Sequence, residues 1–540
     1  MLRAATLRLR RSRSGVRDRR RRFEGLPWVV AAAVSGAALA LAFPPFDLWP
    51  LAFAAVAALS LLTRGRTGRR GGVLGLAFGL GFFVVLLRWL HVIGWDAVLA
   101  LACLQAAFLV PLGAVLAWTS RWRAWPVAHA VLWVGVEALR AREPFGGLPW
   151  GRLAFSQADS PLVRLAALGG SPLVSLAVAG VGVALAATAC AIRSVRLRAL
   201  VPVAAAGAVF GTAALAPVTH GGPTQTTAAL VQGNVPRAGY DTAQQQQVVF
   251  ANHVKATHDL ATAVRAGTAP KPDLVIWPEN SSDMDPFGHL PVQFAIDGAV
   301  DDIGAPTLVG AVLDAGPTHV RNVGIVWSPN TGPGAFYTKR HPVPFGEYLP
   351  MRGLVSTLFA RFHRVPRDFE AGHTPGVLDL GSTRIGDVIC FEIAYDGLVR
   401  DVVRGGGRVI VVQTNNATYG RTGQPQQQLA ITRLQAIAHG RAVVVAATSG
   451  ISAVIDPDGT VRHRTKEFTR EVVVSQVPLL SGSTWADRLG GWPEAALSLA
   501  ALACAALAAP RRRRAAQEAS VGSTAPAEVA LPEGPDTAPP

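Results

Sequence analysis

Long apolar segments fill the first 217 residues of this 540-residue chain and recur once near its C-terminus. A helix needs about 17 to 25 mostly apolar residues to cross a bilayer. The segments that approach this pattern are Pro27–Phe43, Leu48–Leu62, Gly72–Leu90, Asp96–Trp118, Trp125–Leu139, Pro161–Ile192, Leu197–Pro217 and Ala486–Ala509. The pattern therefore predicts a polytopic α-helical membrane domain of about eight transmembrane helices, seven of which precede a region of different character.

Arginine runs predict the orientation of these helices. Residues 1–22 contain ten Arg and one Asp, and further basic runs lie at 64–70, 121–123, 193–198 and 511–514. If the N-terminus is cytoplasmic and about eight helices alternate in direction, all of these runs fall on the cytoplasmic side, as the positive-inside rule favours. A signal peptide is the alternative interpretation of the first segment, although no small-residue cleavage site requires it.

The region from 218 to 485 alternates short β-branched runs with helical patterns, which is typical of an α/β domain. The predicted strands are Ala228–Gln232, Leu274–Trp277, Thr307–Val312, Asn322–Trp327, Arg384–Cys390, Val409–Thr414 and Ala442–Ala447. The predicted orientation places this domain outside the cytoplasmic membrane. The predicted parts are a disordered basic cytoplasmic N-terminus (1–23), the membrane domain (24–217), the extracytoplasmic domain (218–485), a last transmembrane helix (486–510) and a disordered cytoplasmic tail (511–540).

The composition agrees with this division. Half of the residues are hydrophobic and 16% are charged, against about 25% charged in soluble domains, which argues against a wholly soluble protein. The net charge of +16 comes mainly from the terminal Arg runs, so we expect no nucleic-acid partner. The four Cys lie mostly in apolar runs, which argues against a disulfide framework. No Cys/His spacing, Walker loop or dinucleotide motif points to a metal or a cofactor, so none is predicted.

Three passages in the α/β region each place a reactive side chain at or near the end of a predicted strand. They are Val275–Asn280, Phe336–His341 and Asp387–Glu392, which carry Glu279, Lys339 and Cys390. Because ligands bind at the carboxyl ends of strands in open α/β sheets, we expect the three side chains to converge. A Glu can take the proton of a Cys thiol, and a Lys can stabilise the oxyanion with the N–H of the next residue, Phe391. Together these residues would supply the nucleophile, the base and the oxyanion stabiliser that acyl transfer requires.

Each of these residues alone is weak evidence of function. A single Cys at the end of an apolar strand is more often a small core residue. A Glu after Trp-Pro is more often a loop carboxylate, and a Lys in a charged loop is normally solvated. It is the combination that favours a catalytic site, because a purely binding domain has no need of a nucleophile beside a base and a cation.

The chain also shows passages that resemble a known family. They are Val231–Pro236, Pro344–Tyr348, Pro149-Trp150 and Gly450–Asp456, in addition to the three passages above. Together they resemble the nitrilase (carbon-nitrogen hydrolase) superfamily and, within it, the membrane-embedded apolipoprotein N-acyltransferase family, over about Gly25 to Ala509. The resemblance implies a nitrilase-like αββα sandwich outside the membrane.

The same resemblance implies roles for individual residues. Glu279 would be the general base, Lys339 the oxyanion stabiliser and Cys390 the nucleophile. Glu347 matches the second active-site glutamate of the family, and the positions after the nucleophile are Phe391 and Glu392. All three of these are expected to be supporting or substrate-contacting residues.

The implied activity is lipoprotein maturation in the bacterial cytoplasmic membrane. A phospholipid would donate an acyl chain, a Cys390 thioester would carry it, and the free α-amino group of the diacylglyceryl-cysteine of a lipoprotein would accept it. The lipid bilayer is thus an expected partner. Two alternatives remain open from the sequence: a membrane-tethered nitrilase-type amidase that uses water as acceptor, and a non-catalytic lipid-binding scaffold.

The sequence also departs from the family pattern. Thr414–Gly420 lacks a large aromatic residue that many family members have, Tyr240 stands where a Trp is frequent, and Phe391 replaces a frequent Tyr. We expect Tyr240 and Asn416 to be candidate substrate contacts. An apolar stripe along Met351–Phe362 predicts an interfacial helical arm covering the site, with packing on the domain core as the alternative.

Overall fold

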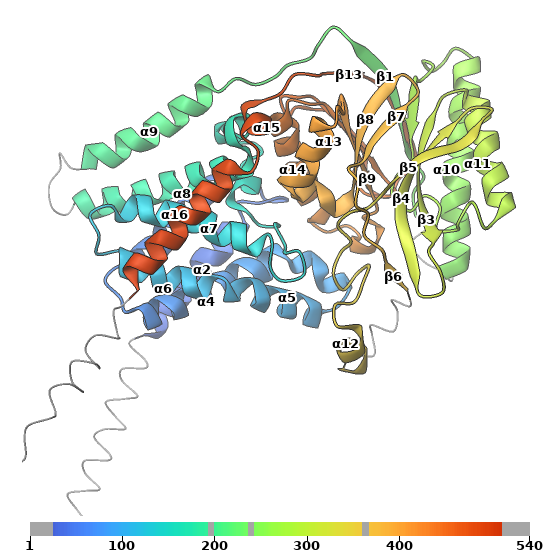
Figure 1. The fold of residues 1–540 in the computed structure, drawn as a ribbon. Helices are drawn as coiled ribbons and strands as arrows, with labels where there is room; N and C mark the ends of the chain where they lie inside the picture. The colour runs from blue at the N-terminus through green and yellow to red at the C-terminus, as the bar shows by residue number, and fades with distance from the viewer. Residues whose placement is uncertain (1–24, 193–198, 236–241, 359–366, 510–540) are drawn as a thin grey trace, which may run out of the picture.

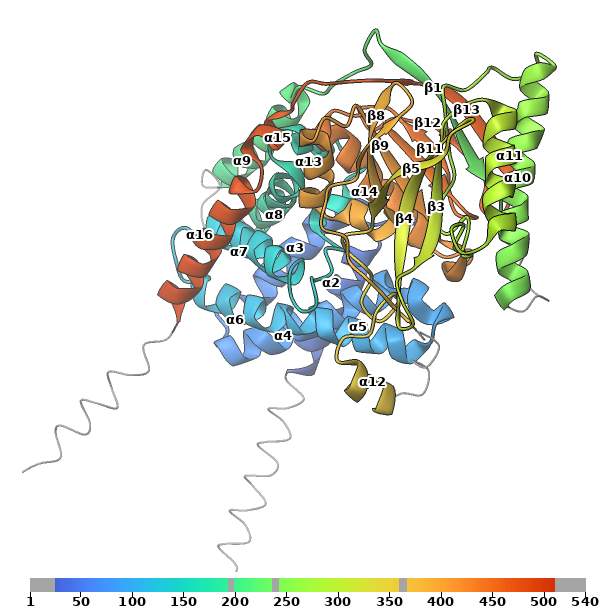
Figure 2. The same cartoon turned by 45° about the vertical axis from the view of Figure 1, so that its right-hand side comes forward.

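The computed structural model describes residues 25–192, 199–235, 242–358 and 367–509. Apolar helices form one part of the molecule, and two β-sheets with their own helices form the other (Figure 1). A view turned by 45° shows the same two parts, with α14 (Gln424–His439) and α15 (Trp485–Leu489) packed against the apolar helices (Figure 2). Tyr240, the basic terminus, the tail and the end of the predicted arm lie outside the described residues.

The helical part contains at least one helix that overlaps each predicted apolar segment. The helices are α2 (Leu26–Ala40), α3 (Pro50–Thr63), α4 (Gly68–Leu86), α5 (Trp95–Ala107), α6 (Leu109–Thr119), α7 (Trp125–Arg140), α8 (Ala166–Ile192), α9 (Leu200–Leu215) and, near the C-terminus, α16 (Trp492–Ala508). Among the described residues, three stretches are long and apolar enough to cross a membrane: Gly68–Leu86, Trp95–Thr119 and Pro161–Ile192. The helices α2, α3, α9 and α16 are shorter and apolar.

Small residues allow these helices to pack closely. A Cβ added at Gly36 on α2 would lie 1.9 Å from the carbonyl oxygen of Phe78 on α4, and one at Gly75 on α4 would lie 2.0 Å from that of Leu109 on α6. Backbones approach this closely only where glycine stands at the crossing, a pattern that is common between helices in membranes.

Two sheets pack face to face in the α/β part. The first sheet has the order β13-β1-β2-β3-β4-β5, with β6 paired to β4, and the second has the order β12-β11-β10-β9-β8-β7. The strands of the first are β13 (Glu471–Pro478), β1 (Gln225–Gln232), β2 (Leu274–Ile276), β3 (Thr307–Asp314), β4 (His319–Ser328), β5 (Gly332–Thr338) and β6 (Asp368–Phe369). The strands of the second are β12 (Val461–Arg464), β11 (Ala453–Ile455), β10 (Val443–Ala447), β9 (Val409–Thr414), β8 (Thr383–Ile389) and β7 (Val377–Leu380).

Helices cover both outer faces of the pair of sheets. The helices α10 (Thr242–Arg265) and α11 (Leu290–Ile303) pack on the first sheet, and α13 (Asp396–Arg404) and α14 (Gln424–His439) pack on the second. Apolar residues of both sheets, such as Leu230 and Val411, form the core between them. This is the predicted nitrilase-like αββα sandwich. Each of the predicted strands lies within or overlaps an observed strand.

The helix α14 joins the two parts of the molecule through a polar side chain. The Gln427 amide oxygen accepts hydrogen bonds from the indoles of Trp89 (3.1 Å) and Trp150 (2.7 Å), and its amide nitrogen donates to the carbonyl oxygens of Pro44 (3.1 Å) and Leu86 (3.3 Å). Gln427 is buried, so these bonds satisfy groups that water cannot reach. The second sheet is thus held against the helical part.

The predicted arm is partly described. The helix α12 spans Arg352–Leu358 and projects from the α/β part beside the helical part (Figure 1). Met351 is 60% exposed, whereas Val355 is buried. The residues 359–366 that would extend this helix lie outside the described residues.

Candidate active site

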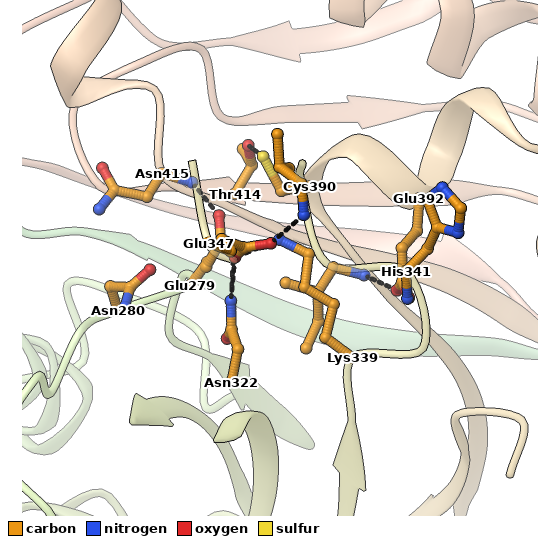
Figure 3. Close-up of polar contacts among 12 residues, drawn as sticks. Glu279, Asn280, Asn322, Lys339, His341, Glu347, Cys390, Glu392, Thr414 and Asn415 are labelled. Carbon is orange, nitrogen blue, oxygen red and sulfur yellow. Dashed lines mark hydrogen bonds and ion pairs between the residues drawn. The ribbon is translucent and has the colours of Figure 1, made fainter. Parts of the chain in front are cut away.

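The ends of four strands meet at one place between the two sheets. Glu279 follows β2, Lys339 follows β5, Cys390 follows β8, and Asn415 follows β9. Figure 3 shows their side chains gathered around a common point, together with Asn322 from within β4. The structure thus brings together Glu279, Lys339 and Cys390.

A buried ammonium is the centre of this group. Lys339 is 1% exposed, and its Nζ lies 2.9 Å from Oε1 of Glu279 and 2.8 Å from Oε1 of Glu347. The amide nitrogen of Asn322 donates to the same two carboxylates, at 2.8 Å and 3.1 Å. Burial opposes the ammonium charge, but the attraction of both carboxylates outweighs it and raises the pKa of Lys339 well above its ordinary value. The cation is therefore permanent and fixed in place.

The backbone fixes both carboxylates. The N–H of Asn415 donates to Oε2 of Glu279 at 2.8 Å, and the N–H of Val343 donates to Oε2 of Glu347 at 2.6 Å. Each carboxylate therefore accepts on both oxygens, and neither can rotate without losing a hydrogen bond. Glu279 joins the two sheets through Asn415, and Glu347 ties the loop after β5 to Lys339.

The nucleophile candidate occupies a tight turn. Cys390 has φ +56°, a left-handed conformation that is uncommon for residues other than glycine, and it begins a short 3₁₀ helix directly after β8. Such a turn presents a side chain outward from the end of a strand, and backbone strain of this kind is found at functional sites. Burial, reinforced by the negative charge of Glu279, raises the pKa of the Cys390 thiol to about 12, although Lys339 and the Thr414 hydroxyl oppose the shift. The resting cysteine is thus a neutral thiol.

Glu392 holds this turn from within. Its carboxylate accepts from the Tyr337 hydroxyl (2.9 Å to each oxygen) and from the backbone N–H groups of Ile389 (2.7 Å), Arg340 (2.7 Å) and His341 (3.0 Å). The start of the nucleophile turn and the two residues after Lys339 are therefore held by one buried side chain. Glu392 does not face open space, so the structure places it as a support.

An aromatic group lies between Cys390 and the helical part. The ring of Phe391 stacks on Trp150 from the helical part, with centroids 6.1 Å apart and 19° between the planes, and it contacts His341 and Tyr395. Burial, and then the positive charge of Lys339, lowers the pKa of His341 to about 4, so its ring is neutral at physiological pH. Phe391 thus provides an uncharged surface directly beside the nucleophile.

Asn416 occupies a different position from the other predicted residues. It is 3% exposed, and its amide nitrogen donates to Gln424 at 2.9 Å and to Gln428 at 2.8 Å, both on α14. These hydrogen bonds hold its side chain against α14. Tyr240, the other candidate substrate contact, lies outside the described residues and stays a prediction.

The structure adds groups that sequence reasoning missed. Asn322 bridges the two glutamates, and the backbone of Asn415 anchors Glu279. Asn322 could have been recognised from the sequence as a candidate site residue, because it is a polar residue inside an apolar strand. The contact between the Asn415 N–H and Glu279 could not have been recognised from the sequence, because a backbone N–H is present at every non-proline position.

A cavity of about 560 Å³ opens beside the glutamate side of the site. Asn280 and Asn415, which neighbour the site residues, line it together with Arg421, Asp283 and Phe468. Its wall thus combines amide, charged and apolar side chains. No grouping of His, Cys, Asp and Glu with the geometry of a metal site occurs within the described ranges.

The fold and the site together define a carbon-nitrogen hydrolase domain joined to an apolar helical domain. Comparisons with known proteins agree: the model of the apolipoprotein N-acyltransferase N-terminal domain matches residues 35–186, and the carbon-nitrogen hydrolase model matches residues 227–487. The apolipoprotein N-acyltransferase of Mycolicibacterium smegmatis is 40% identical over 90% of this chain and 87% of its own length. That of Azotobacter vinelandii is 30% identical over 93% of this chain and 98% of its own.

The chain belongs to the apolipoprotein N-acyltransferase family. Among solved structures, Nit3 of Saccharomyces cerevisiae, a member of branch 10 of the nitrilase superfamily, matches with a TM-score of 0.35 and 15% identity, covering 47% of this chain and 90% of Nit3.

Replacing Glu392 by Gln tests how the nucleophile turn is held. The amide would present an NH₂ group to donors that now meet a carboxylate oxygen, so we expect a loss of about 2 to 4 kcal/mol in stability. Thermal unfolding of the purified protein measures it. Glu370→Gln, which changes an exposed partner of Arg321, should shift the unfolding midpoint little. Equal midpoints for the two variants would contradict this role of Glu392.

Proposed function

We propose that this protein N-acylates lipoproteins, using Glu279, Lys339 and Cys390 as its catalytic residues. The observation that carries the proposal is the buried Lys339 ammonium, bound to two glutamates beside a cysteine on a strained turn. A scaffold that only binds lipid has no need to bury such a charge, because an ammonium in the interior is costly unless it is paired. Membership of the apolipoprotein N-acyltransferase family supports the choice of substrates.

The first half-reaction forms an acyl-enzyme. Cys390 attacks the carbonyl carbon of a phospholipid ester while its thiol proton passes to Glu279. The negative charge that develops on the carbonyl oxygen is stabilised by the Lys339 ammonium and by the N–H of Phe391. The C–O bond then breaks, Glu279 returns the proton to the leaving oxygen, and lysophospholipid departs. A thioester on Cys390 remains.

The raised pKa of the thiol bears on this step. Because burial raises the pKa of the resting thiol, proton transfer to Glu279 during the attack is favoured over a free thiolate that forms first. A neutral thiol also reacts slowly with stray electrophiles. The base is in position for this transfer, since hydrogen bonds from Lys339, Asn322 and Asn415 fix the Glu279 carboxylate.

The second half-reaction transfers the chain to an amine. The α-amino group of the diacylglyceryl-cysteine has an ordinary pKa of about 8 and is partly neutral at physiological pH. It attacks the thioester carbonyl, and Glu279 accepts the proton that the nitrogen loses. The C–S bond then breaks to give an amide, and Glu279 passes that proton to the departing sulfur, which regenerates the thiol. Water is the competing acceptor, and the apolar surface of Phe391 and Trp150 restricts it near Cys390.

The helical part completes the proposal. We infer about eight transmembrane helices between a cytoplasmic N-terminus and a cytoplasmic tail, with residues 218–485 outside the bacterial cytoplasmic membrane. The Arg runs support this orientation, and the apolar helices support insertion. The bilayer would then deliver both lipid substrates to the same face. The helix α12, with exposed Met351 directly before it, would act as an interfacial arm.

Lipoprotein acylation by the purified protein tests the function. With phospholipid and a diacylglyceryl lipopeptide, wild type should form the N-acylated product. Cys390→Ser, Lys339→Met and Glu279→Gln should each lower the rate by about 10³-fold or more, because nucleophile, oxyanion stabilisation and base are lost in turn. Asp379→Asn, an exposed ion-pair variant, is the control. Release of free fatty acid with no amide product would support the water-using amidase instead.

Accessibility of an introduced cysteine tests the orientation. Ser481 lies on the exposed linker between β13 and α15 (Trp485–Leu489). In a variant whose native cysteines are all replaced, Ser481→Cys should react with an impermeant thiol reagent added outside intact cells. Arg121→Cys, in the loop between α6 and α7, should react only after the membrane is opened. The reverse pattern of labelling would overturn the proposed topology.

A further inference from the structure

The sulfur of Cys390 has a hydrogen-bond donor that the reaction described above does not use. The Oγ1 of Thr414, the last residue of β9, lies 3.2 Å from the Sγ. Within the described part of the chain, this hydroxyl is the single hydrogen-bond partner of the sulfur. Thr414 is 1% exposed, so water does not compete for its proton.

The surroundings of the hydroxyl determine where its hydrogen points. Gln428 donates from Nε2 to Oγ1 of Thr414 at 3.1 Å, which occupies the oxygen as an acceptor. The other possible acceptors for the hydroxyl hydrogen are Oε1 of Gln428 at 3.4 Å and Oδ1 of Asn416 at 3.5 Å. Hydroxyl-to-oxygen bonds are normally about 2.5 to 3.0 Å long, so both of these contacts are long and weak, whereas 3.2 Å lies well within hydrogen-bond reach of the larger sulfur atom. The geometry therefore directs the proton to Cys390.

Neighbouring amide side chains fix the orientation of Gln428. Its Oε1 accepts from the amide nitrogens of Asn416 at 2.8 Å and Gln424 at 3.3 Å, so its Nε2 must face the active site. That Nε2 also approaches the carbonyl oxygen of Cys390 at 3.4 Å. Gln428 thus contacts both the nucleophile residue and the hydroxyl that serves it.

We propose that Thr414 is a further catalytic residue, whose hydroxyl donates to the sulfur of Cys390 whenever the sulfur carries negative charge, and that Gln428 is the residue that positions it. The proposal rests on the proposed function only for the identity of the acyl group. The charge on sulfur appears twice, first as the thiol loses its proton and again when the C–S bond of the thioester breaks. A donor fixed in advance stabilises both states without reorganisation.

The charges around the sulfur explain why such a donor is needed. The charges of Glu279 and Glu347 disfavour a thiolate at Cys390, whereas the charge of Lys339 favours it. Tyr419, on the neighbouring short 3₁₀ helix, also lies close to the sulfur. Lys339 is already engaged by two carboxylates. A neutral hydroxyl adds stabilisation to the sulfur without adding another charge to a buried site.

Alkylation of Cys390 by iodoacetamide tests the proposal without any lipid or lipoprotein. The full chain is used, with Cys103, Cys190 and Cys504 replaced by Ala so that one thiol remains. Thr414→Val keeps the shape of the side chain and removes the hydroxyl. Its thiolate fraction should fall about tenfold or more at each pH from 7 to 9. Part of this loss is offset because a more basic thiolate is intrinsically more reactive. We expect alkylation to slow by about 3- to 10-fold.

Two further variants separate this role from a structural one. Thr414→Ser retains the hydroxyl and should alkylate within about twofold of the parent. Thr119→Val removes another buried hydroxyl, one that donates to a backbone carbonyl of α6 at 2.8 Å and does not contact the sulfur; it should also stay within that range. If Thr414→Val does not fold, Thr414→Ala takes its place. Parent-like alkylation in the valine or alanine variant, or slowing in the serine variant as great as in valine, would overturn the proposal.

Acyl transfer then distinguishes this proposal from the proposed function. Consumption of a preformed Cys390 thioester by an amine should slow in Thr414→Val and not in Thr414→Ser, because the departing sulfur loses its donor. If no thioester forms in the parent protein while alkylation still responds to Thr414, the role of Thr414 stands and the proposed function fails.

Discussion

The structure of the site depends on one buried cation. Lys339 is enclosed by protein, and an ammonium in such a place is stable only while Glu279, Glu347 and the groups around them remain in position. Removing one partner of a buried pair typically costs about 3 to 5 kcal/mol. The ammonium thus constrains β2, β4, β5 and the loop that carries Glu347 to one arrangement. The same arrangement places a base and an oxyanion stabiliser beside Cys390.

The contact between the two parts of the molecule is polar where it approaches this site. Gln427 faces the helical part and binds Trp89 and Trp150, whereas the adjacent Gln428 faces the cysteine. Successive positions of one helix therefore serve the domain junction and the nucleophile. This explains how a hydrolase-type sandwich can be held in a fixed position over an apolar helical domain, as the proposed use of membrane lipids requires.

Much of the site was predictable because its residues end apolar strands. Glu279 and Cys390 follow the buried strands β2 and β8, and Lys339 follows the more exposed edge strand β5. Their meeting at one edge follows from the sheet architecture. The role of α14 was not predictable, because Gln424–Gln428 resembles a surface segment and only its partners bury it. Nor did the pattern of the edge strand β13 show that it pairs with β1, since pairing across more than 200 residues leaves no local signal. The apolar segments predicted where the helices lie, but only three of the described stretches are long and apolar enough to cross a membrane.

The central claim is that the sulfur of Cys390 carries the acyl chain between two lipids. Mass spectrometry of the purified protein after incubation with labelled phospholipid, in the absence of acceptor, measures it most directly. The account predicts one acyl chain on the peptide that contains Cys390, removed by hydroxylamine and consumed when a lipopeptide amine is added. Formation of N-acylated lipopeptide by a protein that never acquires this adduct, even when the acceptor is withheld, would contradict the account.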